Sequence, residues 1–151
     1  MDGMESLLAA SFQEAERLQR SWVGEEHLLV ALAKDPNSSR AREALLACGL
    51  DEAVITERVE NMRFEPEPPA LAADERPSPN PHYYKLWGRA EGLAIANSES
   101  LSPEHLLLAM IWDESSVVGA VLRTVDRTPA DLLAALADLG VPVPARVPPV
   151  E

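Results

Sequence analysis

The stretch EHLLVALA at residues 26–33 returns as EHLLLAMI at residues 104–111. Each copy follows an amphipathic stretch and precedes two more, so one order of apolar segments occurs twice in the 151 residues. A period of about 78 residues is far longer than the repeats of solenoid proteins. The pattern therefore predicts a duplicated helical unit whose two halves pack into one small domain.

The composition predicts a soluble protein with one compact core. Apolar residues make up 46% of the chain and charged residues 25%, which are ordinary values for a globular domain. The formal net charge is −12, with acidic residues in excess in both halves. This charge disfavours nucleic acid as a partner, because phosphates attract basic residues. Solubility alone explains the acidic surface, and attraction of basic partners is the alternative.

We expect no signal peptide and no membrane-spanning segment in this sequence. It begins with the acidic stretch MDGME, which lacks the basic region of a signal peptide, and no apolar run is long enough to span a bilayer. The single cysteine, Cys48, excludes an internal disulfide. It lies in an apolar helical run, which favours a buried side chain over a reactive thiol. These features predict a cytoplasmic protein that does not bind membranes.

Apolar residues recur at spacings of three and four through both halves, which is the period of helices. No alternating apolar run predicts a strand. Asp51, Ser102-Pro103 and Thr128-Pro129 mark helix starts, and Gly49 and Gly140 mark helix ends. The sequence therefore predicts an all-α fold of two four-helix repeats. We expect the repeats to bury their apolar faces against each other about a pseudo-two-fold axis.

Proline divides the chain. Six of the 13 prolines fall in residues 66–81 and four in residues 142–149. Proline lacks the helix donor and restricts the residue before it, so both clusters predict non-helical backbone. We expect a first repeat at residues 1–62, a Pro-rich linker at 63–81, a second repeat at 82–140 and a Pro-rich tail at 141–151.

The reactive side chains form no recognisable catalytic set. The sequence contains no Gly-rich phosphate loop, no Gly-x-Ser-x-Gly elbow and no clustered metal ligands. The adjacent carboxylates Glu25 and Glu26 lie at a helix start, where the helix dipole favours negative charge without any acid–base role. His27 and His105 occupy equivalent places in the first helical turn, where we expect partly buried side chains that hold the turn rather than metal ligands. The sequence therefore predicts no enzyme, no metal and no cofactor.

The two copies carry a recognisable motif. VGEEHLLVAL at residues 23–32 and LSPEHLLLAM at residues 101–110 resemble the paired motif of the Clp N-terminal domain, also called the Clp repeat domain. In that family, Gly and then Thr or Pro precede Glu-His and a run of apolar residues, once per repeat. Gly24 and Pro103 match these positions.

A second element supports the resemblance. LACGLD at residues 46–51 resembles the family's Leu-Gly-Val/Ile-Asp element, and Val125-Asp126 stands at that place in the second repeat without the glycine. The resemblance covers about residues 4–140. It implies the fold of a domain that heads AAA+ unfoldases and recruits adaptors and substrates for a compartmental protease. The chain has no Walker motif, so it resembles a free-standing copy that binds but does not unfold.

The resemblance also implies a ligand site. Some members of the family bind phosphoarginine or cyclic peptide antibiotics, and the Glu of each Glu-His pair receives the guanidinium, which maps onto Glu26 and Glu104. The family's Phe-Thr-x-x-Ala, whose hydroxyl helps to bind phosphate, is missing here, and Ser78 is the substitute that the second repeat offers. A purely structural use of Glu26 and Glu104 as helix-start charges is the alternative.

The leading hypothesis is a non-catalytic protein- or peptide-binding module. It would recruit, or compete for, adaptors or substrates of Clp proteolysis, including arginine-phosphorylated clients and a Clp ATPase itself. The alternative is sequestration of a small molecule or a cyclic peptide antibiotic by the same domain.

Overall fold

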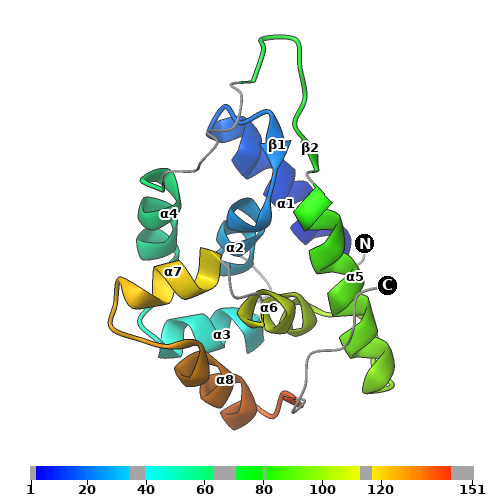
Figure 1. Ribbon diagram of the computed structural model, residues 1–151, viewed down its shortest axis with the longest axis vertical. Helices are drawn as coiled ribbons and strands as arrows, with labels where there is room; N and C mark the ends of the chain where they lie inside the picture. Colours follow the sequence, from blue (N-terminus) through cyan, green and yellow to red (C-terminus); the bar gives the residue numbers. More distant parts are fainter. Residues whose placement is uncertain (1–2, 35–39, 63–70, 80, 113–116, 144–151) are drawn as a thin grey trace.

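The computed structural model describes residues 3–34, 40–62, 71–79, 81–112 and 117–143. Within these ranges the chain forms eight α-helices and two very short strands (Figure 1). In chain order they are α1 (Gly3–Arg17), β1 (Trp22–Val23), α2 (Glu25–Ala33), α3 (Arg40–Ala47), α4 (Glu52–Glu60), β2 (Ser78–Pro79), α5 (Pro81–Ala96), α6 (Pro103–Ile111), α7 (Val117–Arg123) and α8 (Pro129–Asp138). The predicted all-α class with four helices per repeat is confirmed.

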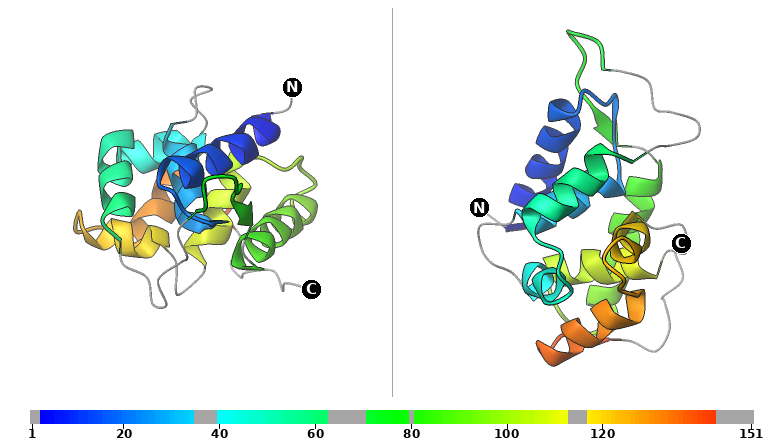
Figure 2. Two further views of the ribbon diagram at one scale, coloured as in Figure 1. Left: turned by 90° about the horizontal axis from the view of Figure 1, so that it is seen from above. Right: turned by 90° about the vertical axis from the view of Figure 1, so that its left-hand side faces the viewer.

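The two helices that carry the repeated stretch form the centre of the molecule. Every residue of α2 is buried, as are residues 104–111 of α6. After their polar first turns both helices are apolar all round, and such a helix must be enclosed on every side. The other helices surround this pair, and α2 and α6 also contact each other (Figures 1 and 2).

The third helix of each half packs against the other half. Helix α3 contacts α6 and α8, and α7 contacts α2 and α4. Each contact thus has a counterpart with the two halves exchanged, which is what a pseudo-two-fold arrangement requires. Leu45 of α3 and Leu122 of α7 are both 0% exposed and belong to one continuous apolar core.

The helix ends repeat as well. Gln19 follows α1 and Ser98 follows α5, and both have left-handed backbone with φ of 57° and 54°. In both places the next amide donates a hydrogen bond to the carbonyl five residues back, at 2.9 and 2.8 Å. This arrangement satisfies carbonyls that a helix end otherwise leaves unpaired.

The ends of α3 and α7 show the same geometry. They also change which residues of the two repeats correspond to each other. Gly49 has φ of 80° and Asp126 has φ of 58°, and the following amides donate to the carbonyls five residues back at 2.9 and 3.0 Å. Asp126 is therefore the counterpart of Gly49, whereas the motif had paired Val125-Asp126 with residues 50–51. The counterpart of Asp51 is Thr128, because these two residues directly precede α4 and α8. The side chain of each accepts a hydrogen bond from the backbone amide three residues further along the chain.

The expectation of no strand is corrected by a short parallel pairing. Trp22 lies opposite Ser78 and Val23 opposite Pro79, and the Ser78 amide donates to the Ser21 carbonyl at 3.1 Å. Proline keeps the approach to α5 extended, so this backbone can pair with the segment before α2. Two residues are too few for any apolar alternation. The pairing ties the segments that lead into α2 and α5 together (Figure 1).

The Pro-rich segments are described only in part. Residues 63–70 and 80 of the expected linker and residues 144–151 of the expected tail lie outside the described ranges. Helix α5 begins at Pro81, where the fixed φ of proline suits the first turn. Val141 is 5% exposed and belongs to the core, so the core continues past Gly140.

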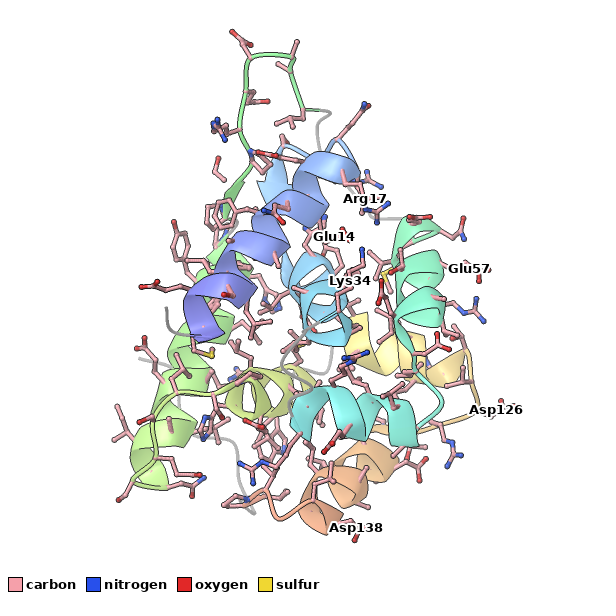
Figure 3. All side chains as sticks on the ribbon, turned by 180° about the vertical axis from the view of Figure 1, so that it is seen from behind. Glu14, Arg17, Lys34, Glu57, Asp126 and Asp138 are labelled. Atoms are coloured by element: carbon pink, nitrogen blue, oxygen red, sulfur yellow. The ribbon has the colours of Figure 1, made fainter. Side chains whose placement is uncertain are left out.

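A buried carboxylate links helix α1 to two other elements. Glu14 of α1 lies 2.9 Å from Arg17 Nε and 2.6 Å from the Nζ of Lys34, just after α2. Arg17 also reaches Glu60 of α4 at 2.7 Å. Figure 3 shows Glu14, Arg17 and Lys34 close together. Although burial would raise the pKa of Glu14, hydrogen bonds from Arg17 and Lys34 lower it.

Candidate functional site: two acidic helix starts

Glu26 and Glu104 are the second residues of α2 and α6, one in each half. Both are buried, with exposed fractions of 7% and 6%. Carboxylates with so little contact with water need hydrogen bonds or a cation to compensate for lost hydration. The dipole of a helix start supplies only part of this compensation.

The neighbouring histidines close the first turn of each helix. His27 Nδ1 accepts a hydrogen bond from the Gly24 amide at 3.0 Å, and His105 Nδ1 accepts one from the Ser102 amide at 2.9 Å. Histidine thus takes the place that Glu or Gln has in the usual capping box. Burial lowers the pKa of His27 to about 4, which keeps the ring neutral and Nδ1 able to accept.

Glu104 holds a guanidinium from its own chain. Its Oε1 accepts hydrogen bonds from the backbone amide of Arg40 at 3.2 Å and from Arg40 Nε at 3.3 Å. Burial alone would raise the pKa of Glu104, but hydrogen bonds from Ser102 and its own amide and the charge of Arg40 bring it below its usual value. Glu104 is therefore ionised at neutral pH. Its carboxylate caps the start of α3, because Arg40 is the first residue of that helix.

Glu26 has a different environment. Its carboxylate lies over Gly24, where an added Cβ would come within 2.8 Å of both carboxylate oxygens. Among the described residues, the close polar neighbour of this carboxylate from another residue is His27 Nδ1, which lies 3.5 Å from Oε1. Burial raises the pKa of Glu26, and the charge of Glu25 acts in the same direction, whereas a hydrogen bond from its own backbone amide and the charges of Arg20 and His82 oppose the rise. Within the described ranges, no guanidinium occupies the position that Arg40 fills at Glu104.

The surroundings of Glu26 include residues that sequence reasoning did not single out. Glu25 is 3% exposed, and its Oε2 lies 3.0 Å from Nε2 of His82 in the first turn of α5. Arg20 carries a positive charge that reaches Glu26, and His82 adds one when it is protonated. Only the folding of α5 against the start of α2 brings His82 here, so no local spacing could have indicated it.

Ser78, the proposed phosphate-side residue, lies in β2 and is exposed. It pairs with Trp22, two residues before Gly24, so it lies beside the strand that leads into α2. The structure thus brings Ser78 to the Glu26 side. Gly24 caps α2 and Pro103 is the first residue of α6, the positions that their motif predicted.

Other kinds of site receive no support from the described residues. In those ranges no three His, Cys, Asp or Glu side chains could together hold a metal ion. None of the helices there is both long and apolar enough to cross a membrane.

Comparisons with known proteins agree with this geometry. The family model described as the Clp repeat (R) N-terminal domain matches residues 2–125. The chain belongs to this family of Clp N-terminal domains. One relative is the chaperone protein ClpB of Oceanobacillus iheyensis, which is 27% identical over 124 residues. That match covers 79% of this chain but spans only 14% of the relative.

Solved structures show the same fold. The N-terminal domain of ClpD from Arabidopsis thaliana has a TM-score of 0.71 at 17% identity, covering 92% of each chain. The Hsp104 N-terminal domain from Candida albicans has a TM-score of 0.68 at 14% identity, covering 93% of this chain and 90% of that one. At these identities the likeness concerns the fold alone.

Proposed function

We propose that this domain is a non-catalytic module that binds arginine-bearing segments of proteins or peptides at the start of α2. Through this site it would recruit, or compete for, adaptors or substrates of a Clp unfoldase. Membership of the Clp N-terminal domain family supports the general role, and the environment of Glu26 supports the chemistry of the ligand.

One observation carries the proposal. Glu104 binds the guanidinium of Arg40, which is evidence that this place in the fold suits that group. Glu26 occupies the equivalent place, is 7% exposed, and has no guanidinium in hydrogen-bonding contact among the described residues. Arginine matches such a carboxylate well, because its planar donors form charge-assisted pairs and it is weakly hydrated.

The charges around Glu26 favour a cation with an anionic group attached. Glu25 and Glu26 are two buried acids side by side, and the raised pKa of Glu26 reflects its burial and this repulsion. The positive charge of an arriving guanidinium would compensate Glu26 for its lost hydration and would reduce the repulsion between the two carboxylates. Arg20, His82 and the exposed hydroxyl of Ser78 lie on the same side of the fold and could meet a phosphate. Arginine-phosphorylated segments are therefore the ligands that we propose.

The test is a calorimetric titration with a short acetylated peptide that carries one phosphoarginine, compared with the same peptide carrying lysine. Glu26→Gln removes the charge with little change in shape. Loss of a charge-assisted pair costs about 1.5–3 kcal/mol, so the affinity should fall about ten- to a hundredfold. Glu52→Gln is the matched control, because Glu52 is an exposed acid in the first turn of α4. Equal affinities of wild type and Glu26→Gln would refute the assignment of this site.

A further inference from the structure

The two acidic helix starts differ in what lies against them. At Glu104 the cation comes from within the chain, since Arg40 Nε and the Arg40 amide both donate to Oε1. At Glu26, Arg20 acts through its charge, as does His82 when it is protonated. The duplication therefore produced two similar carboxylates of which one is already paired.

We propose that Arg40 is an internal competitor that closes the second guanidinium site, leaving the domain one open site at Glu26 and one closed site at Glu104. This inference rests on the proposed function of Glu26. It adds to that function a stoichiometry of one peptide per chain, and it assigns to Arg40 the role of setting this number.

The repeat explains why the closure is one-sided. Arg40 is the first residue of α3, and the first residue of α7, the equivalent helix, is Val117. The same separation of 77 residues relates Gly49 to Asp126, the left-handed residues after these helices. Valine has no donor in its side chain, so α7 supplies no counterpart of Arg40 to Glu26.

The Arg40 contact is of a kind that can be displaced. Its side chain is 41% exposed and contacts Glu104 through Nε at 3.3 Å. An arginine that presents two parallel donors binds a carboxylate more strongly than one that presents a single long contact. The bond from the Arg40 amide to Glu104 comes from the backbone, so it survives replacement of the side chain. Arg40→Ala should thus open the site while α3 keeps its cap.

The experiment is a titration of the full chain, labelled with ¹⁵N, with acetyl-Gly-Arg-Gly-amide and with its arginine-phosphorylated form. The amides of Gly24 and Ser102 report on the two sites separately, because each donates to the histidine of its own helix start. In wild type we expect the Gly24 signal to shift at low peptide concentration and the Ser102 signal to respond only at concentrations about tenfold or more higher.

In Arg40→Ala the Ser102 signal should shift in the same concentration range as Gly24, with two peptides bound per chain. Adding Glu104→Gln to Arg40→Ala should abolish the new site and leave the Gly24 response unchanged. Arg58→Ala is the matched control, since it removes one positive charge from α4, where Arg58 contacts Thr124 and Glu57. It should leave the stoichiometry at one.

The outcomes separate the two proposals. If wild type binds at Gly24 but Arg40→Ala gains no site, the closure is wrong and the proposed function stands. If only Arg40→Ala binds, at Ser102, the closure stands and the assignment of function to Glu26 fails. If neither protein binds, both ideas are overturned. Arg40→Gln, which keeps most of the side-chain length, replaces Arg40→Ala if the dispersion of amide signals shows that the alanine variant does not fold.

Discussion

At the scale of single residues, His27 makes the stability of the fold depend on pH. It is 1% exposed, and its Nδ1 must stay unprotonated to accept the Gly24 amide. Its pKa of about 4 in the folded protein lies below the value of 6.5 that an unfolded chain would show. Below pH 6.5 the unfolded state therefore binds a proton that the folded state does not, and acid favours unfolding.

We expect the free energy of unfolding to decrease as the pH falls from 6.5 towards 4, by up to about 3 kcal/mol from this group. Chemical denaturation at several pH values measures the effect. His27→Gln keeps an acceptor for the Gly24 amide and should remove this part of the pH dependence. His105→Gln is the matched variant for the same backbone hydrogen bond in the second repeat. A His27→Gln protein with the same slope between pH 6.5 and 5 as wild type would contradict the argument.

The candidate site was only partly predictable from these residues. Its acids and histidines could be placed at helix starts because their motif repeats and lies beside Gly24 and Pro103. Arg40 could not be connected with Glu104, since the two are 64 positions apart and nothing local indicates the contact. Sequence similarity between the copies predicted two equivalent sites, whereas Arg40 makes them different.

At the scale of single elements, the ends of α1 and α5 repeat one backbone geometry, and so do the ends of α3 and α7. Gln19, Gly49, Ser98, Asp126 and Gly140 all have left-handed backbone. Gly49 and Gly140 were recognisable as helix ends because glycine adopts this backbone without strain. Gln19 and Ser98 were not, since neither residue type indicates a positive φ. The short β1–β2 pairing escaped prediction for a different reason, because it depends on where α5 packs.

Exchanging residues at these ends should change stability in opposite directions. Gln19→Gly removes the Cβ that strains a left-handed backbone, so we expect the free energy of unfolding to rise by about 0.5–1 kcal/mol. Gly49→Ala should cost about 1 kcal/mol for the same reason. Its added Cβ meets nothing within 4 Å, so backbone strain alone acts there. Thermal unfolding measures both, and a destabilised Gln19→Gly protein would show that the Gln19 side chain makes a stabilising contribution instead.

At the scale of the whole molecule, the third helix of each half packs against the other half, and this makes the stability of the two halves interdependent. Leu45 of α3 is 0% exposed in a helix that contacts α6 and α8. Half-domains of this size rarely bury enough apolar surface to fold alone. The two repeats are therefore expected to form one cooperative unit, although they are separate in the sequence.

Leu45→Ala should destabilise the domain by about 2–5 kcal/mol and affect both halves equally. Amide hydrogen exchange measures this, with α2 reporting on the first half and α6 on the second. Leu46→Ala is the matched control. Leu46 is the next residue and is 48% exposed, so its replacement should have little effect on stability. Loss of protection confined to α2 would show that the repeats unfold independently.

The same packing of α3 has a consequence for how chains assemble. The surfaces of α6 and α8 that receive α3 recognise a helix, and an identical helix from a second molecule offers the same side chains. An exchange of halves between two chains would give an intertwined dimer that keeps each contact between helices. The protein concentration during folding would then determine which product forms. In dilute solution α3 packs within its own chain and gives a monomer, whereas at higher concentration α3 of a second chain competes for the same surface and favours the dimer.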